Sequence, residues 1–315
     1  MNEALLFQKY KASYSAALAD FATYTLMMTG TIYSVWLFKA SYASIATVPF
    51  LGLMLAKTFI IFHDCGHGSY TPSKTINKSL EWLLSVSVFT DPNWTKKHAL
   101  HHRTNGHLHG EGDFNEVIFT TVDELTSYSP TVFFLFKTVY HPIMRFTFLP
   151  FFYFFIYQRF RLSTYSLFTT GVHNAMLLLF VSTLRFYGIF WHYAGGIQVF
   201  AMIAFFLFFN QHTFNPSYVV KEGWNMRKSA LEGSSRILIP LPLTYFTGGI
   251  EYHHVHHANS KIPGYHTKRF HEEGGFNVYT MNLRECLANV WLISFDEKKG
   301  RYVTLEEIQS APSLS

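Results

Sequence analysis

The histidines of this chain are grouped in a way that suits metal binding. Three short segments carry most of them, HDCGH at 63–67, HALHH at 98–102 and HHVHH at 253–257, and NQH at 210–212 adds one more. Residues three and four positions apart lie on one face of a helix, so each of the three segments would present two or three imidazole rings together. The candidate ligands are His63, His67, His98, His101, His102, His212, His253, His256 and His257.

These histidines predict a site for two metal ions. Neutral imidazole binds iron, copper, zinc or nickel, and a single ion takes only about four to six ligands. Without a cation, nine clustered imidazoles would repel one another when protonated and lose hydration when buried neutral. The chain has only two cysteines, Cys65 and Cys286, which excludes a thiolate-rich zinc or iron–sulfur site.

Other polar residues next to the histidine segments are candidates for supporting roles. Asp64, Asp113 and Glu251 could orient a metal-bound imidazole by accepting its second N–H, or could instead be solvated or paired with lysine. Asn210 could hold a metal-bound water. His254 is expected to point away from its neighbours, and the histidines without the helical spacing are expected at the surface or membrane interface: His107, His109, His141, His173, His192, His266 and His271.

The composition indicates a membrane protein. Hydrophobic residues make up 49% of the chain and aromatic residues 18%. Charged residues make up only 14%, against about 25% in typical soluble domains. This composition argues against a soluble protein and excludes disorder. The net charge of +5 and pI of about 9.0 suit contact with an anionic lipid surface better than with nucleic acid, which is not expected as a partner.

The distribution of charge predicts four membrane-spanning helices in two hairpins. Lys39 is the only formally charged residue from 21 to 56, and Arg185 is the only one from 162 to 220, so each would lie at a hairpin tip, with Lys57 at a helix end. The expected spans cover about 21–38, 43–62, 167–184 and 187–209, each long enough to cross the hydrocarbon layer.

The remaining basic residues predict the sidedness. They lie in the termini and the central segment, which places these on the cytoplasmic side. A cytosolic helical cap from 63–165 and 210–315 would complete one domain of 1–315. Segment 77–90 is expected to form an amphipathic helix on the membrane surface, and the interrupted apolar segment 133–157 to lie in the interface.

The histidine segments resemble the motifs of a known protein family. HDCGHGSY at 63–70, HALHH, NQH and HHVHH resemble, in order and spacing, the histidine boxes of membrane fatty acid desaturases. Four further segments are similar to the acyl-lipid branch, which includes delta-12 or omega-6 enzymes: TNGHLHGEGDF at 104–114, TVDEL at 121–125, ALEGSS at 230–235 and SKIPGYH at 260–266.

The resemblance implies a function as well as a fold. It implies four transmembrane helices, a cytosolic cap with a di-iron centre, and the nine histidines as iron ligands. The substrates would be a fatty acyl chain, as part of a membrane lipid, and dioxygen. The HPGG motif of a fused cytochrome b5 does not occur, so the resemblance implies a separate electron donor of ferredoxin or cytochrome b5 type.

The chemistry of the proposed substrate agrees with a desaturase, but other classes of protein remain as alternatives. A mid-chain methylene C–H has no acidity and no leaving group, so its removal requires metal-activated oxygen rather than acid–base catalysis. A related di-iron membrane hydroxylase or carotenoid ketolase stays open, although TVDEL and LEGSS favour desaturation. A metal transporter would need ionisable residues along its spans, which are nearly free of charge. A bis-histidine haem protein would have to rely on His173 and His192.

Overall fold

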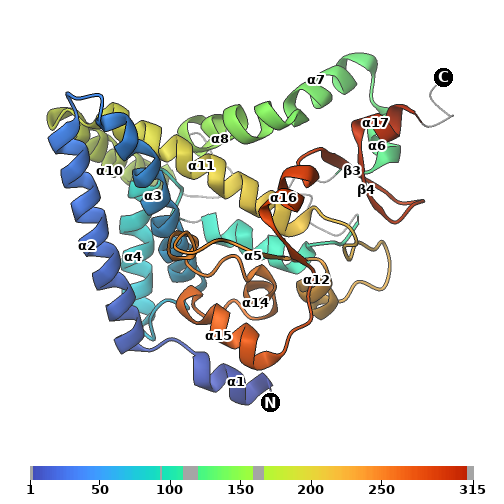
Figure 1. The fold of residues 1–315 in the computed structure, drawn as a ribbon, viewed down its shortest axis with the longest axis horizontal. Coiled ribbons are helices and arrows are strands. Elements are labelled where there is room, and N and C mark those ends of the chain that lie inside the picture. The colour runs from blue at the N-terminus through green and yellow to red at the C-terminus, as the bar shows by residue number, and fades with distance from the viewer. Residues whose placement is uncertain (1–2, 93, 109–119, 159–166, 311–315) are drawn as a thin grey trace.

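The protein is mostly helical (Figure 1). The computed structural model describes residues 3–92, 94–108, 120–158 and 167–310. The helices are α1 (Glu3–Tyr10), α2 (Tyr14–Phe38), α3 (Ser44–His67), α4 (Lys74–Ser87), α5 (Trp94–Thr104), α6 (Val122–Ser127), α7 (Pro130–Tyr140), η1 (Met144–Phe148), α8 (Leu149–Phe151), η2 (Phe152–Tyr157), α10 (Leu167–Phe186), α11 (Phe190–His212), α12 (Met226–Glu232), α13 (Thr244–Thr247), α14 (His253–Ala258), α15 (Gly264–Gly274), α16 (Leu283–Asn289) and α17 (Leu305–Gln309). Four short strands complete the described structure: β1 (Arg236–Ile237), β2 (Thr280–Met281), β3 (Leu292–Asp296) and β4 (Arg301–Thr304).

All four segments expected to span the membrane are helical. Of the described helices, α3, α10 and α11 are both long and apolar enough to cross a bilayer. Helix α2 has 25 residues, which is sufficient length, but it is not one of these three. A membrane location for three helices is therefore supported, whereas four spans in two hairpins stays a prediction.

The ends of the long helices determine where the histidines lie. Helix α3 stops directly after His67, because Gly68 takes the left-handed conformation with φ of 64° and caps the helix. Helix α11 has His212 as its last residue. Each helix thus carries histidine in its final turns, as expected from the sequence.

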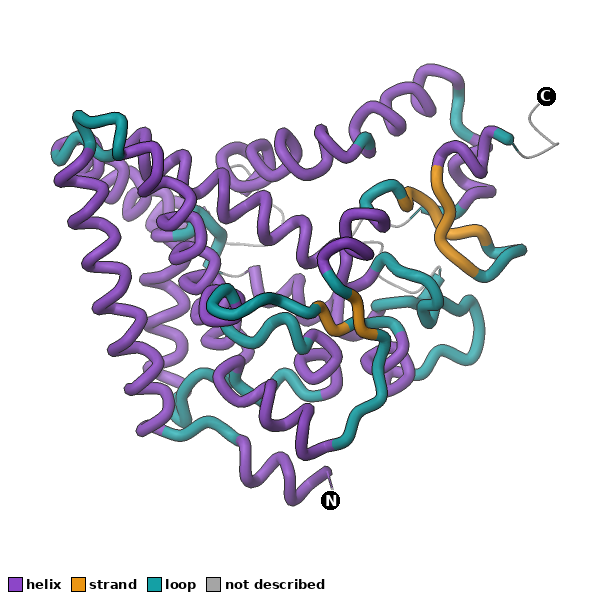
Figure 2. Tube along the Cα trace, in the orientation of Figure 1, coloured by secondary structure: helices purple, strands orange, loops and turns teal. Residues whose placement is uncertain are grey.

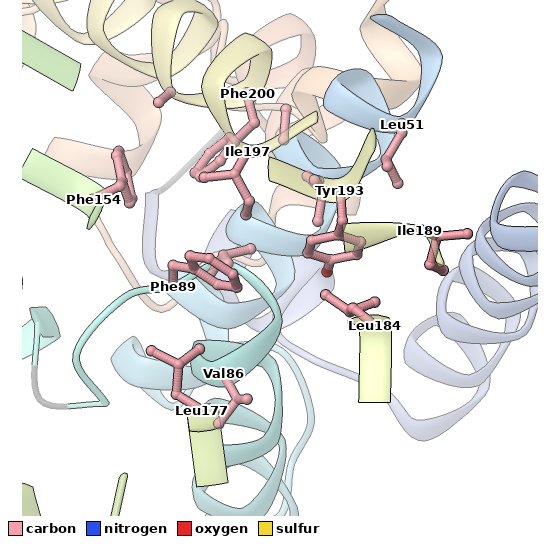
Figure 3. Close-up of a cluster of buried hydrophobic side chains, with 14 of the residues drawn as sticks. Leu51, Val86, Phe89, Phe154, Leu177, Leu184, Ile189, Tyr193, Ile197 and Phe200 are labelled. Atoms are coloured by element: carbon pink, nitrogen blue, oxygen red, sulfur yellow. The ribbon is translucent and has the colours of Figure 1, made fainter. Parts of the chain in front are cut away.

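Helices α3 and α11 form the centre of the bundle and approach each other closely. A Cβ atom on Gly52 of α3 would lie 2.5 Å from the Val199 side chain, and one on Gly196 of α11 would lie 2.7 Å from Leu51. Small residues allow such close packing between apolar helices. Side chains from α4 and α10 complete the buried cluster around this crossing (Figure 3).

The prediction of an all-helical protein is wrong in the cap. Strands β1 and β2 form a parallel pair, and β3 and β4 form an antiparallel hairpin (Figure 2). The hairpin turn is stabilised by Asp296, whose Oδ1 accepts hydrogen bonds from the backbone N–H groups of Lys298 and Lys299, both at 3.0 Å. The short apolar segment LISFD, followed by a turn ending in Gly300, was the sequence signal for this hairpin.

The segments expected at the membrane surface are helical. Helix α4 covers most of 77–90 and packs against α3. Segment 133–157 forms α7, η1, α8 and η2, two of which are π-helical. Their position at the membrane surface stays a prediction.

Lys57 does not lie at a helix end, contrary to expectation. It is buried ten residues before the end of α3, where its Nζ lies 2.8 Å from Asp20 Oδ1 of α2. The side chains of Lys57 and Asp20 are 5% and 14% exposed. Tyr70 also donates a hydrogen bond to Asp20 Oδ2 at 3.0 Å. An ion pair therefore joins α2 to α3 inside the bundle.

Replacing one partner of this pair is expected to destabilise the protein. The Lys57→Met variant leaves the Asp20 carboxylate buried without its cation, which costs about 3–5 kcal/mol in comparable buried pairs. The double variant Lys57→Met with Asp20→Asn removes both charges and should recover most of this loss. Thermal unfolding in detergent would measure it, and a single variant as stable as the wild type would contradict the assigned role.

Candidate metal centre

Four elements bring the histidines to one place. The end of α3 supplies His63 and His67, and the end of α11 supplies His212. The short helices α5 and α14 supply the other candidates, all of which are buried. Segments separated by up to about 190 residues therefore meet here.

The imidazoles form two groups of four. The first group contains His63, His67, His98 and His256, and the second contains His101, His212, His253 and His257. Within each group the candidate ligand atoms lie within 4.8 Å of one another.

The ninth candidate, His102, lies beside both groups. Its Nε2 is 3.1 Å from His98 Nε2 in the first group. Its ring stacks on that of His257 in the second group, with centroids 4.2 Å apart. All nine sequence candidates thus gather at one site.

The nitrogen atoms of the first group converge on a common point. His63 Nε2 lies 3.0 Å from His98 Nε2 and 3.1 Å from His256 Nε2, and the latter two are 3.2 Å apart. Each nitrogen carries either a proton or a lone pair. Because two of any three must be alike, N–H···N bonds cannot satisfy all three close pairs. A shared cation would satisfy them all.

The spacing of the nitrogens also constrains the ion. In the second group, His212 Nε2 lies 3.0 Å from His101 Nε2 and 2.9 Å from His253 Nε2. Two nitrogens that each lie about 2.1 Å from one ion are about 3.0–3.4 Å apart, depending on the angle at the ion. The separations in both groups are close to this range, so the nitrogens of each group could share one ion.

Burial favours the neutral form of most of these rings, which is the form that binds a metal. Loss of hydration, followed by the proximity of neighbouring histidines, holds the pKa values of His98, His256 and His257 well below the usual value. The pKa of His102 falls to about 3 for the same reasons. The Nε2 atoms of His67, in the first group, and His257, in the second, have no hydrogen-bond partner in the described part of the chain. A cation bound by each group would satisfy them.

Two oxygen atoms orient rings of the site. Asp64 Oδ1 lies 3.2 Å from His63 Nδ1, while its Oδ2 accepts a hydrogen bond from the Gly264 N–H at 2.7 Å. The Gly233 carbonyl lies 3.1 Å from His212 Nδ1. Sequence reasoning considered Asp64 but missed Gly233, since a backbone carbonyl leaves no residue-type signal.

The other supporting candidates have different surroundings. Glu251 Oε2 accepts a hydrogen bond from the Thr247 hydroxyl at 2.6 Å, and burial raises the pKa of Glu251. Asn210 donates to the Phe206 carbonyl at 2.9 Å, and its buried Oδ1 has no partner among the residues described. Asp113 lies outside the described residues.

Among the remaining histidines that the structure describes, His141 is exposed and four are half-buried: His107, His192, His266 and His271. The His254 ring turns away from the groups, with Nε2 2.8 Å from His271 Nδ1. His173 was expected at the surface or the membrane interface but is buried in the protein, with Nε2 3.0 Å from the Ser85 hydroxyl of α4. His109 lies outside the described residues.

The crossing of α3 and α5 was not foreseen from the sequence. Gly66, between His63 and His67, packs so closely against Thr95 that a Cβ atom there would overlap the Thr95 side chain. The Thr95 hydroxyl in turn donates to the buried Glu81 Oε1 at 2.8 Å. This contact fixes the first two histidine segments relative to each other.

A largely apolar cavity of about 520 Å³ adjoins the histidines. His63, His98 and His253 form part of its wall, and most of the remainder consists of aromatic and aliphatic side chains from α3, η2 and α11. This volume lies within the range of about 300–1,000 Å³ that is usual for small-molecule sites. The arrangement can hold a hydrocarbon chain against a metal centre.

Comparisons with known proteins agree with this arrangement. A sequence model of the fatty acid desaturase family matches residues 13–280. A fatty acid desaturase of Bacillus subtilis (strain 168) is 32% identical over 275 residues, which are 82% of this chain and 76% of the relative.

Shorter similarities extend to plant and fungal proteins. An endoplasmic reticulum omega-3 fatty acid desaturase of Vigna radiata var. radiata is 28% identical over 119 residues, 36% of this chain and 30% of the relative. A Delta(12) fatty acid desaturase of Mortierella alpina is 33% identical over 58 residues, 18% of this chain and 14% of the relative. With the family match over most of its length, this chain belongs to the fatty acid desaturase family and is a fatty acid desaturase, an oxidoreductase.

Proposed function

We propose that the protein inserts a double bond into the acyl chain of a membrane lipid, using two iron ions held by the nine histidines. The observation that carries this proposal is the pair of four-imidazole groups on the wall of an apolar cavity. One group would hold each ion, with His102 between them. Dioxygen is the oxidant, and a separate ferredoxin or cytochrome b5 type protein supplies the electrons.

The donor set supports iron. All candidate ligands are imidazoles, a ligand type that suits iron among the transition metals. When bound, iron supplies the activation of dioxygen that breaking an unactivated C–H bond requires.

The residues of the chain provide placement and protection. The aromatic cavity wall holds the acyl chain and excludes water, and the positions of His63, His98 and His253 set which methylene groups face the metals. Asp64 holds the His63 ring in one orientation. In the overall reaction, the substrate loses one hydrogen atom from each of two adjacent carbons, which become a C=C bond. These two hydrogen atoms, two electrons from the carrier and two protons reduce one dioxygen molecule to two water molecules.

The topology proposed for the membrane follows from the helix ends. Helices α3 and α11 both end in histidine, so they would cross the bilayer toward the same side. With α2 and α10 as the other two spans, the termini, the cap and the metal centre would lie on the cytoplasmic side.

Expression in a host that makes saturated and monounsaturated lipids, together with an electron donor, tests the activity. Gas chromatography with mass spectrometry should reveal a new lipid that has lost two hydrogens. A new diene would indicate a delta-12 type position, and a new monoene a delta-9 type position. Products that gain oxygen would indicate a hydroxylase instead, and unchanged lipids would contradict the proposal. The His98→Ala variant, inserted normally, should make no product.

Metal analysis tests the cofactor separately. Purified protein is expected to contain about two iron ions per chain, and a chelator should remove both iron and activity. Stoichiometric zinc, or no transition metal at all, would contradict the proposed centre.

A further inference from the structure

A polar corner in the wall of the apolar cavity is not explained by the metal centre. Arg145 of η1 and Tyr140 of α7 both line this cavity. Neither is next to a histidine of the two groups in sequence. Since the remaining lining is largely hydrocarbon, a buried guanidinium and a phenol here require a reason.

The guanidinium of Arg145 is only partly satisfied. The residue is 6% exposed. It donates to the backbone carbonyls of Tyr140 at 2.9 Å, Leu292 at 3.1 Å and Val290 at 3.5 Å. Its Nε has no hydrogen-bond partner among the described residues. Arginine has five N–H donors, so donor capacity is left over.

The phenol of Tyr140 is in the same situation. Its hydroxyl is buried, and the described chain offers it no hydrogen-bond partner. The Arg145 Cζ lies 4.9 Å from the centre of the Tyr140 ring, so the two polar groups belong to one corner. A buried polar group without a partner costs about 1–3 kcal/mol. An oxygen acceptor brought by a ligand would remove that cost.

This corner remains cationic at neutral pH. Desolvation lowers the pKa of Arg145 to about 10, which leaves the side chain protonated. The rings of Phe209 and Phe146, with centroids 4.6 Å and 5.7 Å from Arg145 Cζ, flank the charge. The terminal methyl group of an acyl chain cannot accept a hydrogen bond from this corner, whereas a carboxyl or ester oxygen can.

Two neighbouring residues of α11 connect this corner to the metal centre. Phe208 of α11 contacts the rings of His98 and His101, at centroid distances of 6.4 Å and 5.1 Å. The next residue, Phe209, lies against Arg145. Both phenylalanines line the cavity, which therefore runs from the histidines to the polar corner.

We propose that Tyr140 and Arg145 bind the carbonyl end of the acyl substrate, through its carboxylate or ester oxygen. This inference rests on the proposed function of the same cavity. Fixing the carbonyl end sets how many methylene groups separate it from the metals. The position of the double bond is then measured from the carboxyl end of the chain rather than from its methyl end.

Binding of brominated probes tests this without turnover or iron. Bromine quenches tryptophan fluorescence, and Trp94 lines the cavity. The probes are 9,10-dibromostearate, its methyl ester and 9,10-dibromo-octadecane. Tyr140→Phe should weaken binding of a carbonyl probe by about 2- to 10-fold, the size of one hydrogen bond. It should leave binding of the hydrocarbon unchanged.

The two carbonyl probes distinguish the source of the oxygen. A loss confined to the acid would identify a free carboxylate, and a loss that includes the ester would identify an ester carbonyl as found in lipids. Arg145→Met should produce a larger loss for the same probe. The Arg145 variant also loses the hydrogen bonds to Val290 and Leu292, so it could fold less well. Tyr140→Phe is the cleaner test, because the Tyr140 hydroxyl has no partner among the described residues. Equal binding of every probe by Tyr140→Phe and wild type would overturn the proposal.

The products of a chain-length series give a second test. Cells expressing the protein would be supplied with saturated acids of 14, 16 and 18 carbons. We expect the double bond at one fixed distance from the carboxyl carbon in all products. A fixed distance from the methyl end would overturn the proposal while leaving the proposed desaturation intact. A complete lack of product would count against desaturation itself, and the probe measurements would still decide the role of the corner.

Discussion

Replacing His256 by alanine is expected to eliminate desaturation, lowering activity by more than about 100-fold. His256 Nε2 lies 3.1 Å from His63 Nε2 and 3.2 Å from His98 Nε2, so its loss opens the first group. Mutation of a residue that only orients a metal ligand already lowers metal affinity or activity by about 10- to 100-fold. Iron content and lipid products of the purified and expressed variant would measure the effect.

The same histidine segment offers a matched control. His254 is equally buried, but its ring bonds to His271 and faces away from both groups. The His254→Gln variant keeps a polar side chain there and should retain both ions. Activity in His256→Ala, or loss of iron in His254→Gln comparable to that in His256→Ala, would contradict the assignment of the first group.

The second large effect is expected from Gly66→Ala. A methyl group at this position overlaps the Thr95 side chain, so α3 and α5 must move apart. Overpacking of this kind costs about 1–3 kcal/mol. The displacement would also separate His63 and His67 from His98, which belong to one group. We therefore expect iron content and activity to fall together, even where the protein still inserts into the membrane.

Gly171→Ala provides the comparison. Gly171 lies in the interior of α10, and its added Cβ would have nothing within 4 Å. Alanine has a higher helix propensity than glycine by about 1 kcal/mol, so this variant should be neutral or slightly stabilising. If both variants behaved alike, the contact between Gly66 and Thr95 would not be the reason for any loss.

Sequence reasoning identified the histidines but not how they are partitioned. The spacing of His98, His101 and His102 predicts that they share one face of a helix, and all three are buried in α5. The structure nevertheless divides them, with His98 in the first group and His101 in the second. The partition depends on the angles at which α5 and α14 meet the ends of α3 and α11. Local spacing contains no information about those angles.

Long-range polar contacts were equally invisible in the sequence. Lys57 was expected at a helix end, but it is buried in an ion pair with Asp20, which lies 37 positions earlier. His173 was assigned to the surface or the membrane interface, yet it bonds to Ser85 of α4. The acceptors of Arg145 include carbonyls near residue 290, which only the folded chain brings close. Helix positions follow from local pattern, whereas these contacts require the tertiary arrangement.

The interleaved origin of the two histidine groups has a consequence for biosynthesis. Helices α5 and α14 each contribute to both groups, and α11 completes the second. A ribosome-bound chain therefore lacks the complete set of histidines of either group until the segment ending at His257 has emerged and folded back onto the earlier helices. Binding of the two proposed ions should consequently be a late event that requires a nearly finished polypeptide.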